Sequence, residues 1–313
     1  MYCMPPFVSI KLPPRALSSI SFRSFRARRT VHMDAATKTR HMERTSAEPR
    51  GKSLHAVTID RIDGINERIR LFRLGLQTGP AKFLPGQWLD TYIPGSPKAG
   101  GFTITSTPSA AADLSRPYLE LAVQHADDGP AAWLWRPVDE ILGTTLQVRV
   151  GGSFVCPPQG AELKDIKRLV FIAGGVGINP LMSMLGTLAE MEQRSHLTVD
   201  VLYATKVPRQ GMRHVLFLER IAALFGEKGF RGQVRVYATG GGFDIKDINC
   251  SGVEVKAGRP SLGEILNIVG EQTESTYVYV CGPPTMTDEI VEGLTNSDNG
   301  VLAPDRVLRE KWW

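Results

Sequence analysis

Cysteine is scarce in this sequence, with four residues among 313. None forms a Cys-x-x-Cys pair, so the sequence lacks both the ligand spacing of a zinc site and the clustered thiolates of an iron–sulfur cluster. Four scattered cysteines are also a poor disulfide framework, which favours a reducing compartment. The four are Cys3, Cys156, Cys250 and Cys281.

Long apolar runs are missing as well. No stretch approaches the roughly 20 apolar residues that span a bilayer, so we expect no transmembrane segment. The net charge of +5 is unevenly distributed, because residues 1–50 hold 10 Lys/Arg and 3 Asp/Glu, a net charge of +7. The remainder therefore carries a net charge of −2. Since the rest of the chain is not basic, we expect no nucleic acid partner.

Acidic residues are absent from the N-terminal segment before Asp34, where arginine and serine are frequent. This composition is typical of an organelle transit peptide, and prolines and basic residues interrupt every apolar run that a secretory signal would need. We expect residues 1–50 to be a transit peptide or disordered, and the protein to be mitochondrial. A disordered basic tail without an address is the alternative.

Short strands dominate the chain from residue 51 to residue 157. Leu119, Leu121 and Val123 alternate with polar or small residues, which is the period of a strand with one buried face. Glycine and proline turns separate the strands, and one helix is predicted over residues 129–136. The spacing predicts an antiparallel six-stranded barrel. Its strands are expected over residues 53–60, 67–77, 87–93, 101–106, 118–125 and 144–154.

Strands and helices alternate from residue 165 to residue 313, after a proline-rich break at residues 156–160. The strands are continuously apolar, as in a parallel sheet covered on both faces. This pattern predicts a doubly wound α/β domain with its ligand at the carboxyl edge of the sheet. Strands are expected over 168–173, 198–204, 233–238 and 276–281, and helices over 179–193, 211–225, 261–270 and 284–294.

A glycine-rich turn follows the first of these α/β strands. Glycines allow a tight turn and a close backbone approach to a ligand, while Asn179 suits a helix N-cap and Pro180 suits the first helical turn. A helix N-terminus offers free N–H groups to a pyrophosphate. The alternative is a tight strand–helix turn that binds nothing. The turn comprises Gly174, Gly175, Val176, Gly177, Ile178, Asn179 and Pro180.

This turn resembles the nucleotide-phosphate turn of the ferredoxin–NADP reductase-like family. Two further motifs support the resemblance, namely the Cys-Gly-Pro-Pro-Thr-Met sequence that starts at Cys281 and the terminal Glu-Lys-Trp-Trp. The resemblance implies a flavin-binding-type barrel followed by a nicotinamide-dinucleotide-binding domain. It also implies that the glycine-rich turn binds the pyrophosphate of NAD or NADP.

The resemblance assigns roles to three residues at the end of the last predicted strand and to one at the C-terminus. Cys281, Gly282 and Pro283 would lie by the nicotinamide, and Trp312 would stack on a flavin. Cys281 is otherwise an ordinary buried cysteine, and Trp312 otherwise closes the domain interface.

The sequence around Phe102 matches the flavin motif Arg-x-[Tyr/Phe]-[Ser/Thr] only in part. By the resemblance Phe102, Thr103 and Ser106 would contact the flavin of FAD, but Gly100 stands in place of the arginine that pairs with its pyrophosphate. Alanines also replace the hydroxyl residue of a second motif, Gly-x-x-[Ser/Thr], in residues 128–132. These replacements are expected to weaken FAD binding.

The choice between NAD and NADP stays open. Thr205 and Lys206, at the end of a predicted strand, are expected beside the adenosine ribose, and no acidic residue is there to hold a free 2′-hydroxyl. Lys206 and Arg209 can pair with a 2′-phosphate, or they can belong to a solvated loop.

Two functions are therefore compatible with the sequence. The first is an NAD(P)H-dependent oxidoreductase that passes hydride to a flavin and electrons to an acceptor, which would be a diffusible molecule or a partner protein. The second is a sensor or scaffold that binds the nucleotide without turnover, favoured by Gly100 and the alanines. A methyltransferase is a weaker alternative, because it explains neither the barrel nor the Cys281 motif.

Overall fold

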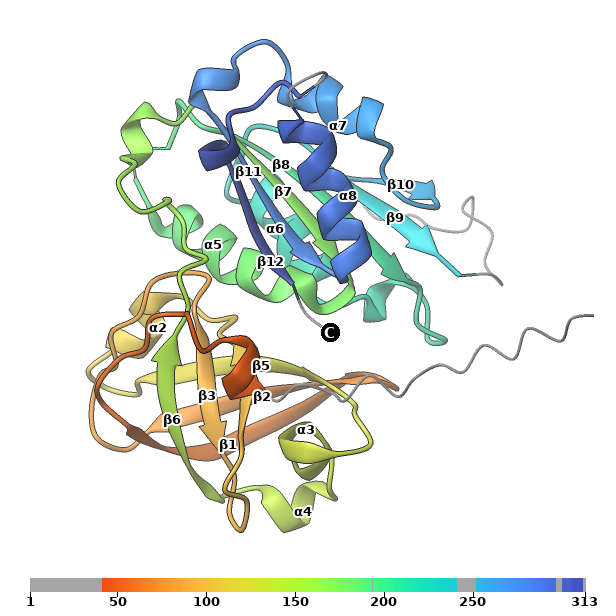
Figure 1. Cartoon of the computed structure of the whole chain (residues 1–313). Helices are drawn as coiled ribbons and strands as arrows, with labels where there is room; N and C mark the ends of the chain where they lie inside the picture. The colour runs from red at the N-terminus through yellow and green to blue at the C-terminus, as the bar shows by residue number, and fades with distance from the viewer. Residues whose placement is uncertain (1–40, 193, 241–251, 297–299, 312–313) are drawn as a thin grey trace, which may run out of the picture. The chain divides into compact units, whose positions relative to one another are not determined.

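The computed structural model describes residues 41–192, 194–240, 252–296 and 300–311. Within these residues it contains one antiparallel and one parallel sheet, each of six strands (Figure 1). The predicted fold class, a six-stranded barrel followed by a doubly wound parallel sheet, is confirmed. No described helix is long and apolar enough to cross a membrane.

The antiparallel sheet has the strand order β4-β3-β6-β1-β2-β5. Ile104, directly after β4, forms an antiparallel bridge with Leu121 of β5, which joins the two edges into a barrel. The strands are β1 (His55–Asn66), β2 (Ile69–Leu76), β3 (Trp88–Tyr92), β4 (Ala99–Thr103), β5 (Tyr118–Gln124) and β6 (Thr145–Gly151). Short helices α2 (Pro108–Ala112), α3 (Gly129–Leu134) and α4 (Val138–Ile141) lie between them along the chain.

The barrel core follows the alternation that the sequence predicts. Leu119, Leu121 and Val123 of β5 are buried in one apolar cluster together with Phe72 and Leu74 of β2. Phe72 pairs with Leu121 and Leu74 with Leu119, so the inward side chains of neighbouring strands stack. The other face of β5 is left for contacts outside the barrel.

The parallel sheet has the strand order β10-β9-β8-β7-β11-β12. Helices α5 and α6 cover one face of it, and helices α7 and α8 cover the other (Figure 1). The strands are β7 (Arg168–Gly174), β8 (Thr198–Lys206), β9 (Val234–Thr239), β10 (Val253–Ala257), β11 (Thr276–Gly282) and β12 (Val307–Lys311). The helices are α5 (Ile178–Glu190), α6 (Leu218–Gly226), α7 (Leu262–Val269) and α8 (Pro284–Thr295).

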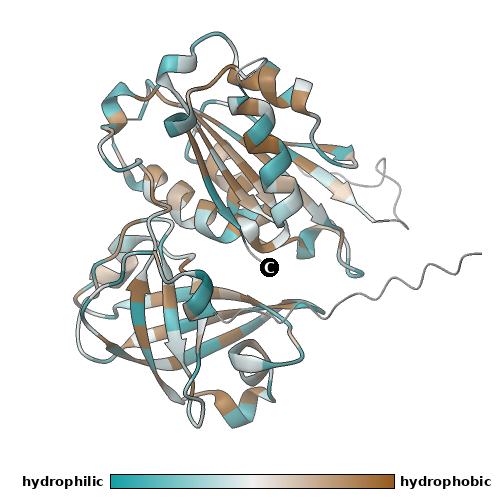
Figure 2. Ribbon diagram, in the orientation of Figure 1, coloured by the Kyte–Doolittle hydropathy of each residue, from teal (hydrophilic) through white to brown (hydrophobic). Residues whose placement is uncertain are grey.

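The apolar strands of this sheet are buried on both faces. Leu169 and Phe171 of β7 belong to the cluster with α5 and α6, whereas Val170 and Ile172 belong to the cluster with α7 and α8. Figure 2 shows the resulting brown strands, which explain why their sequences are continuous rather than alternating. The edge strands β10 and β12 are additions to the four strands expected.

The folded part begins earlier than the sequence analysis places it. Residues 41–50, assigned there to a disordered segment, start with helix α1 (His41–Arg44) and continue to an isolated bridge between Arg50 and Gly151. We call residues 41–50 the N-terminal strap. The boundary at residue 51 is therefore corrected to residue 41, because the strap is held by the barrel through contacts described below.

Candidate functional site

A cavity of about 780 Å³ lies at the carboxyl edge of the parallel sheet. This is the edge at which doubly wound sheets bind ligands, and the volume is within the range of small-molecule and cofactor sites. The wall from the sheet comprises Gly174, Gly175, Val176, Ala204, Thr205, Lys206, Val207, Pro208, Thr239, Arg259, Pro283, Thr285 and Met286. Residues of the barrel strands and of the β1–β2 turn also line it, namely Asn66, Glu67, Arg68, Ile69 and Gln124, as do Val215 and Leu216.

Each glycine of the predicted phosphate turn has its own structural reason. Gly175 has a φ of 56°, which favours glycine, and a Cβ there would meet no atom within 4 Å, so the turn is open. A Cβ on Gly174 would lie 2.7 Å from Cδ of Pro283, and one on Gly177 only 2.1 Å from the carbonyl oxygen of Cys281. Gly174 and Gly177 thus let the turn pack against the end of β11, while Gly175 leaves room at the cavity.

The structure divides the predicted nucleotide residues into two groups. Gly174, Gly175, Val176, Thr205, Lys206 and Pro283 line the cavity. Gly177, Ile178, Asn179, Pro180, Cys281 and Gly282 do not line it, and all of them are buried. The second group packs in the interior, next to the residues that line the cavity.

Asn179 does not cap helix α5, as the sequence had suggested. The helix starts one residue earlier, at Ile178, and its N-cap position is Gly177. The Asn179 side chain instead donates a hydrogen bond of 3.0 Å from Nδ2 to the carbonyl oxygen of Ala122 in β5. Sequence pattern cannot distinguish these uses, because the partner is 57 residues away.

The two residues assigned to chemistry lie outside the cavity wall or outside the described residues. The Cys281 side chain is completely buried in the apolar cluster shared with α5. Trp312 falls outside the residues that the structure describes, so its stacking role stays a prediction. In this conformation Cys281 shapes the end of β11, and its backbone contacts Gly177.

Arg259 and Arg68 are functional candidates that sequence reasoning missed. Together with Lys206, they are the three cationic side chains among the described residues of the cavity wall, where Glu67 is the one acidic side chain. Arg259 follows β10, a short edge strand with alternating polar residues, and Arg68 lies in the turn between β1 and β2. Arg209, the second basic residue considered for a phosphate, is exposed and not part of the wall.

The predicted flavin residues lie on or near strand β4. Phe102 is partly buried against the barrel core, and Thr103 is buried opposite Trp88 of β3. The buried Ser106 hydroxyl accepts a 3.1 Å hydrogen bond from the backbone N–H of Glu120. Within the barrel, Ser106 is therefore hydrogen-bonded and Thr103 is buried in the strand pairing.

Aromatic rings of the chain itself cover the glycines of this region. A Cβ on Gly100 would lie 2.7 Å from Cε2 of Phe102, and one on Gly101 would lie 2.1 Å from Nδ1 of His41. On β6, which pairs with the other side of β3, a Cβ on Gly151 would lie 2.5 Å from the Trp88 ring. These glycines therefore allow close ring packing by Phe102, His41 and Trp88.

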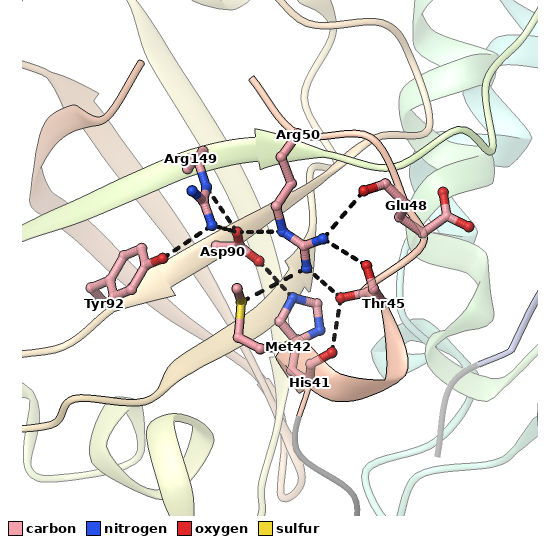
Figure 3. Close-up of polar contacts among 8 residues, drawn as sticks. All are labelled: His41, Met42, Thr45, Glu48, Arg50, Asp90, Tyr92 and Arg149. Atoms are coloured by element: carbon pink, nitrogen blue, oxygen red, sulfur yellow. Dashed lines mark hydrogen bonds and ion pairs between the residues drawn. The ribbon is translucent and has the colours of Figure 1, made fainter. Parts of the chain in front are cut away.

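The buried carboxylate of Asp90 holds the strap on this face (Figure 3). Asp90 accepts hydrogen bonds from Nε2 of His41 at 2.9 Å and from Nε of Arg50 at 2.9 Å. Arg149 of β6 donates to the same carboxylate at 2.8 and 3.0 Å. The guanidinium of Arg50 also lies 5.0 Å from the centroid of the Trp88 ring.

These contacts determine the ionisation of Asp90. Burial alone would raise the pKa of Asp90, but the hydrogen bonds from His41, Arg149 and Arg50 outweigh it and lower the pKa to about 2. Asp90 is therefore a carboxylate at neutral pH. A second anchor of the strap is Glu48, whose Oε2 accepts hydrogen bonds from the Ser153 backbone at 3.0 Å and from its hydroxyl at 2.6 Å.

The residues of β4 do not fit a flavin held in the manner that the resemblance implies. Gly100 offers no charge to a pyrophosphate, and the Phe102 ring with Pro130 fills the space that a side chain at position 100 would need. The His41 and Trp88 rings lie on Gly101 and Gly151. No group of described residues has the composition of a metal site.

Sequence comparison finds a matching domain model and relatives that align with most of this chain. A family model described as "Oxidoreductase NAD-binding domain" matches residues 171–292. The protein named oxidoreductase NAD-binding domain-containing protein 1 from Danio rerio is 31% identical over 288 residues, which cover 90% of this chain and 100% of that protein. The protein of the same name from Homo sapiens is 31% identical over 296 residues, covering 91% and 88%. The chain therefore belongs to the oxidoreductase NAD-binding domain-containing protein 1 family.

Comparison with solved structures shows that this member of the oxidoreductase NAD-binding domain-containing protein 1 family has the ferredoxin–NADP reductase-like fold. A ferredoxin NADP+ reductase from Neisseria gonorrhoeae with bound FAD and NADP matches with a TM-score of 0.57 at 19% identity, covering 83% of this chain and 98% of that chain. The flavohem-like FAD/NAD binding domain of nitric oxide dioxygenase from Vibrio cholerae matches with a TM-score of 0.60 at 17% identity, covering 82% and 98%. At these identities the likeness concerns the fold.

Proposed function

We propose that this protein is an NAD(P)H-dependent oxidoreductase that binds its nucleotide in the cavity at the carboxyl edge of the parallel sheet. The observation that carries the proposal is the open turn at Gly175, which precedes the N-terminus of α5 and lines that cavity. Free backbone N–H groups and the helix dipole stabilise a pyrophosphate at such a position. The family model over residues 171–292 supports the same nucleotide.

The chain's part in the reaction is binding and orientation. The dihydronicotinamide would lose a hydride and become the oxidised nicotinamide, and the acceptor would gain the two electrons and the proton. Pro283, Thr285 and Met286 line the cavity after β11 and would position the nicotinamide ring. The barrel residues Ile69 and Gln124 on the opposite wall would limit access of water.

The fold neighbours and the barrel residues of this chain favour different assignments of the hydride acceptor. Two neighbours are named for FAD, which supports a flavin as the acceptor. The rings packed on Gly100, Gly101 and Gly151 count against FAD bound as the resemblance implies. They favour the second candidate, a protein that binds NAD(P) as a sensor or scaffold without turnover. In the enzyme, electrons would pass to a diffusible acceptor or a partner protein.

The test begins with the full chain purified from cells. Its visible absorption is recorded before and after anaerobic addition of NADH or NADPH, with and without added FAD. Oxidation of the nucleotide with matching bleaching of a flavin band would support the flavin-dependent enzyme. Nucleotide binding without oxidation by any acceptor tried would contradict the enzyme and leave the sensor or scaffold.

A matched pair of glycine variants tests the cavity itself. Gly175 and Gly79 both have positive φ, at 56° and 88°, and a Cβ on either meets no atom within 4 Å. Both alanine variants carry similar backbone strain, but only Gly175 lines the cavity. We expect Gly175→Ala to weaken NAD(P)H binding at least tenfold, measured by nucleotide fluorescence, and Gly79→Ala to leave it unchanged. Equal affinities in both variants would contradict the site.

We also propose, from the composition of residues 1–50, that the protein is mitochondrial. The support is the excess of arginine and serine before Asp34. Imaging of the full chain with a C-terminal tag beside a mitochondrial marker tests this proposal. Retention of mitochondrial targeting after deletion of residues 1–38 would contradict the role given to the segment.

A further inference from the structure

We infer that the cavity selects NADP(H) over NAD(H), and that Arg259 and Lys206 together bind the 2′-phosphate. The inference rests on the proposed nucleotide site and adds the identity of its adenosine substituent. Arg259 is the residue that the sequence pattern did not bring to this site.

Strand register places the two cations along one line at the sheet edge. Lys206, the last residue of β8, is the register partner of Thr239 in β9. On the other side of β9, Ala257 of β10 pairs with Ala238, and the N–H of Gly258 donates a 2.9 Å hydrogen bond to the carbonyl oxygen of Ala238. By this register, Gly258 is level with Thr239, and Arg259 is the next residue along the chain. Arg259 therefore lies two strands away from Lys206.

Neighbouring strands are about 4.8 Å apart, so the backbones at Lys206 and Arg259 are separated by roughly 10 Å. Both side chains are long enough to converge on one phosphate from that separation. Gly258 has a φ of 88°, a conformation that favours glycine and turns the chain just before Arg259. All three of Lys206, Thr239 and Arg259 line the cavity.

The charges at this end of the cavity favour a phosphate over a hydroxyl. NAD-specific sites hold the free ribose 2′-hydroxyl with an acidic residue near the end of the second strand, whereas NADP sites use basic residues there. Among the described residues that line the cavity, the one acidic side chain is Glu67, in the β1–β2 turn. Neither Lys206 nor Arg259 forms an ion pair with any residue that the structure describes.

Two described acidic residues of β10 and α7 pair with other side chains. Glu254 of β10 pairs with Arg235 at 2.7 Å, and Glu264 of α7 pairs with Lys256 at 2.6 Å. Neither carboxylate lines the cavity. Lys206 and Arg259 are therefore available for an anionic ligand, and a guanidinium with an ammonium suits a dianionic phosphate.

Two fragments of the coenzymes isolate this end of the site. Adenosine 2′,5′-bisphosphate and adenosine 5′-monophosphate differ only in the 2′-phosphate, and their affinities for the full chain can be measured by calorimetry. We expect the 2′-phosphorylated compound to bind at least tenfold more tightly, with NADPH preferred over NADH by a similar factor. Raising the salt concentration should reduce this preference.

Variants then assign the effect to residues. Arg259→Gln and Lys206→Gln should each weaken binding of the bisphosphate roughly ten- to hundredfold, the value of a charge-assisted hydrogen bond, and leave the monophosphate unchanged. Arg209→Gln, a change to an exposed cation of the same loop outside the cavity wall, should leave both affinities unchanged. Arg259→Lys should recover part of the preference, because it keeps the charge without the planar fork.

Equal affinities for the two compounds, or an Arg259→Gln effect that is the same on both, would overturn this inference while leaving the nucleotide site intact. Arg209→Gln acting as strongly as the other two variants would also overturn the assignment to Arg259 and Lys206. Binding of neither compound, nor of NADH or NADPH, would overturn the proposed function together with the inference.

Discussion

Two glycine-rich parts of this molecule have opposite surroundings. At the end of β7, Gly175 turns beside a cavity of about 780 Å³, with no atom near the position of a Cβ. On β4 and β6, Gly100, Gly101 and Gly151 lie beneath the rings of Phe102, His41 and Trp88. The first part leaves its backbone open to a ligand, whereas in the second the protein covers its own backbone.

The difference shows that a glycine cluster alone does not identify a binding site. Glycine permits close approach, but the approaching group can be a cofactor or a side chain of the same chain. On the barrel, the buried carboxylate of Asp90 holds His41 over Gly101 and pairs with Arg50, whose guanidinium lies by the Trp88 ring.

The largest effect is expected for Asp90→Asn, which breaks the anchor of the covered region. The variant leaves Arg50 and Arg149 facing a neutral group in a largely buried place, and removing one partner of such a network costs about 3–5 kcal/mol of unfolding free energy. Urea denaturation measures the loss. Asp63→Asn, in the exposed pair with Arg61, is the matched control and should cost less than about 1 kcal/mol. Similar losses in the two variants would show that Asp90 is not an anchor.

The next effect is expected in the open region. Gly177→Ala places a Cβ 2.1 Å from the carbonyl oxygen of Cys281, so β11 and the turn must separate. We expect a loss of about 3 kcal/mol, typical of severe overpacking, together with weaker nucleotide binding. Gly263→Ala, at a position in helix α7 without close contacts, should be neutral or stabilising by up to about 1 kcal/mol. Thermal melting with and without NADPH distinguishes the two variants.

A pH titration sharpens the comparison further. The folded pKa of Asp90 is lowered from its ordinary value of 3.8 to about 2, so its contribution is present above about pH 4 and is lost as the pH falls toward 2. The contribution is about 2 kcal/mol. The stability difference between the wild type and Asp90→Asn should therefore shrink across this window. A difference that stays constant from pH 5 to pH 2 would rule out this linkage.

The smallest effect is expected for Gly100→Arg, which restores the arginine of the flavin motif. Its Cβ would meet the Phe102 ring and Pro130 at 2.7 Å, so we expect a loss of about 1–2 kcal/mol and no gain of FAD binding. Gly64→Arg, at an open and exposed strand position, is the control for adding an arginine. A yellow, FAD-loaded Gly100→Arg protein would show that the covering rings yield to a flavin.

Periodicity was sufficient to predict the two sheets, because their strands have either one or two buried faces. It missed β10, whose residues are all partly or fully exposed, and β12, which lies after a short 3-10 turn near the C-terminus. Without β10 there was no reason to bring Arg259 to the sheet edge. Local pattern identifies strands well where burial is strong and poorly where a strand forms the edge.

The N-terminal strap was also beyond sequence reasoning. Its residues are mostly polar, and the contacts that hold it join His41 and Arg50 to Asp90, 49 and 40 positions away. The prediction that Asn179 caps a helix was wrong for the same reason, because its hydrogen-bond partner Ala122 is distant in sequence. The candidate cavity, in contrast, was partly predictable because parallel strands bring their carboxyl ends to one edge.

One apolar cluster contains residues from both sheets. Leu71 of β2 and Ala122 of β5 share it with Leu181 and Leu185 of α5 and with Phe171 of β7. A boundary drawn along the chain at residue 157 therefore does not divide the interior into two independent cores. Loss of either sheet exposes apolar surface of the other, so heating should melt the barrel and the α/β part together, as a single cooperative transition.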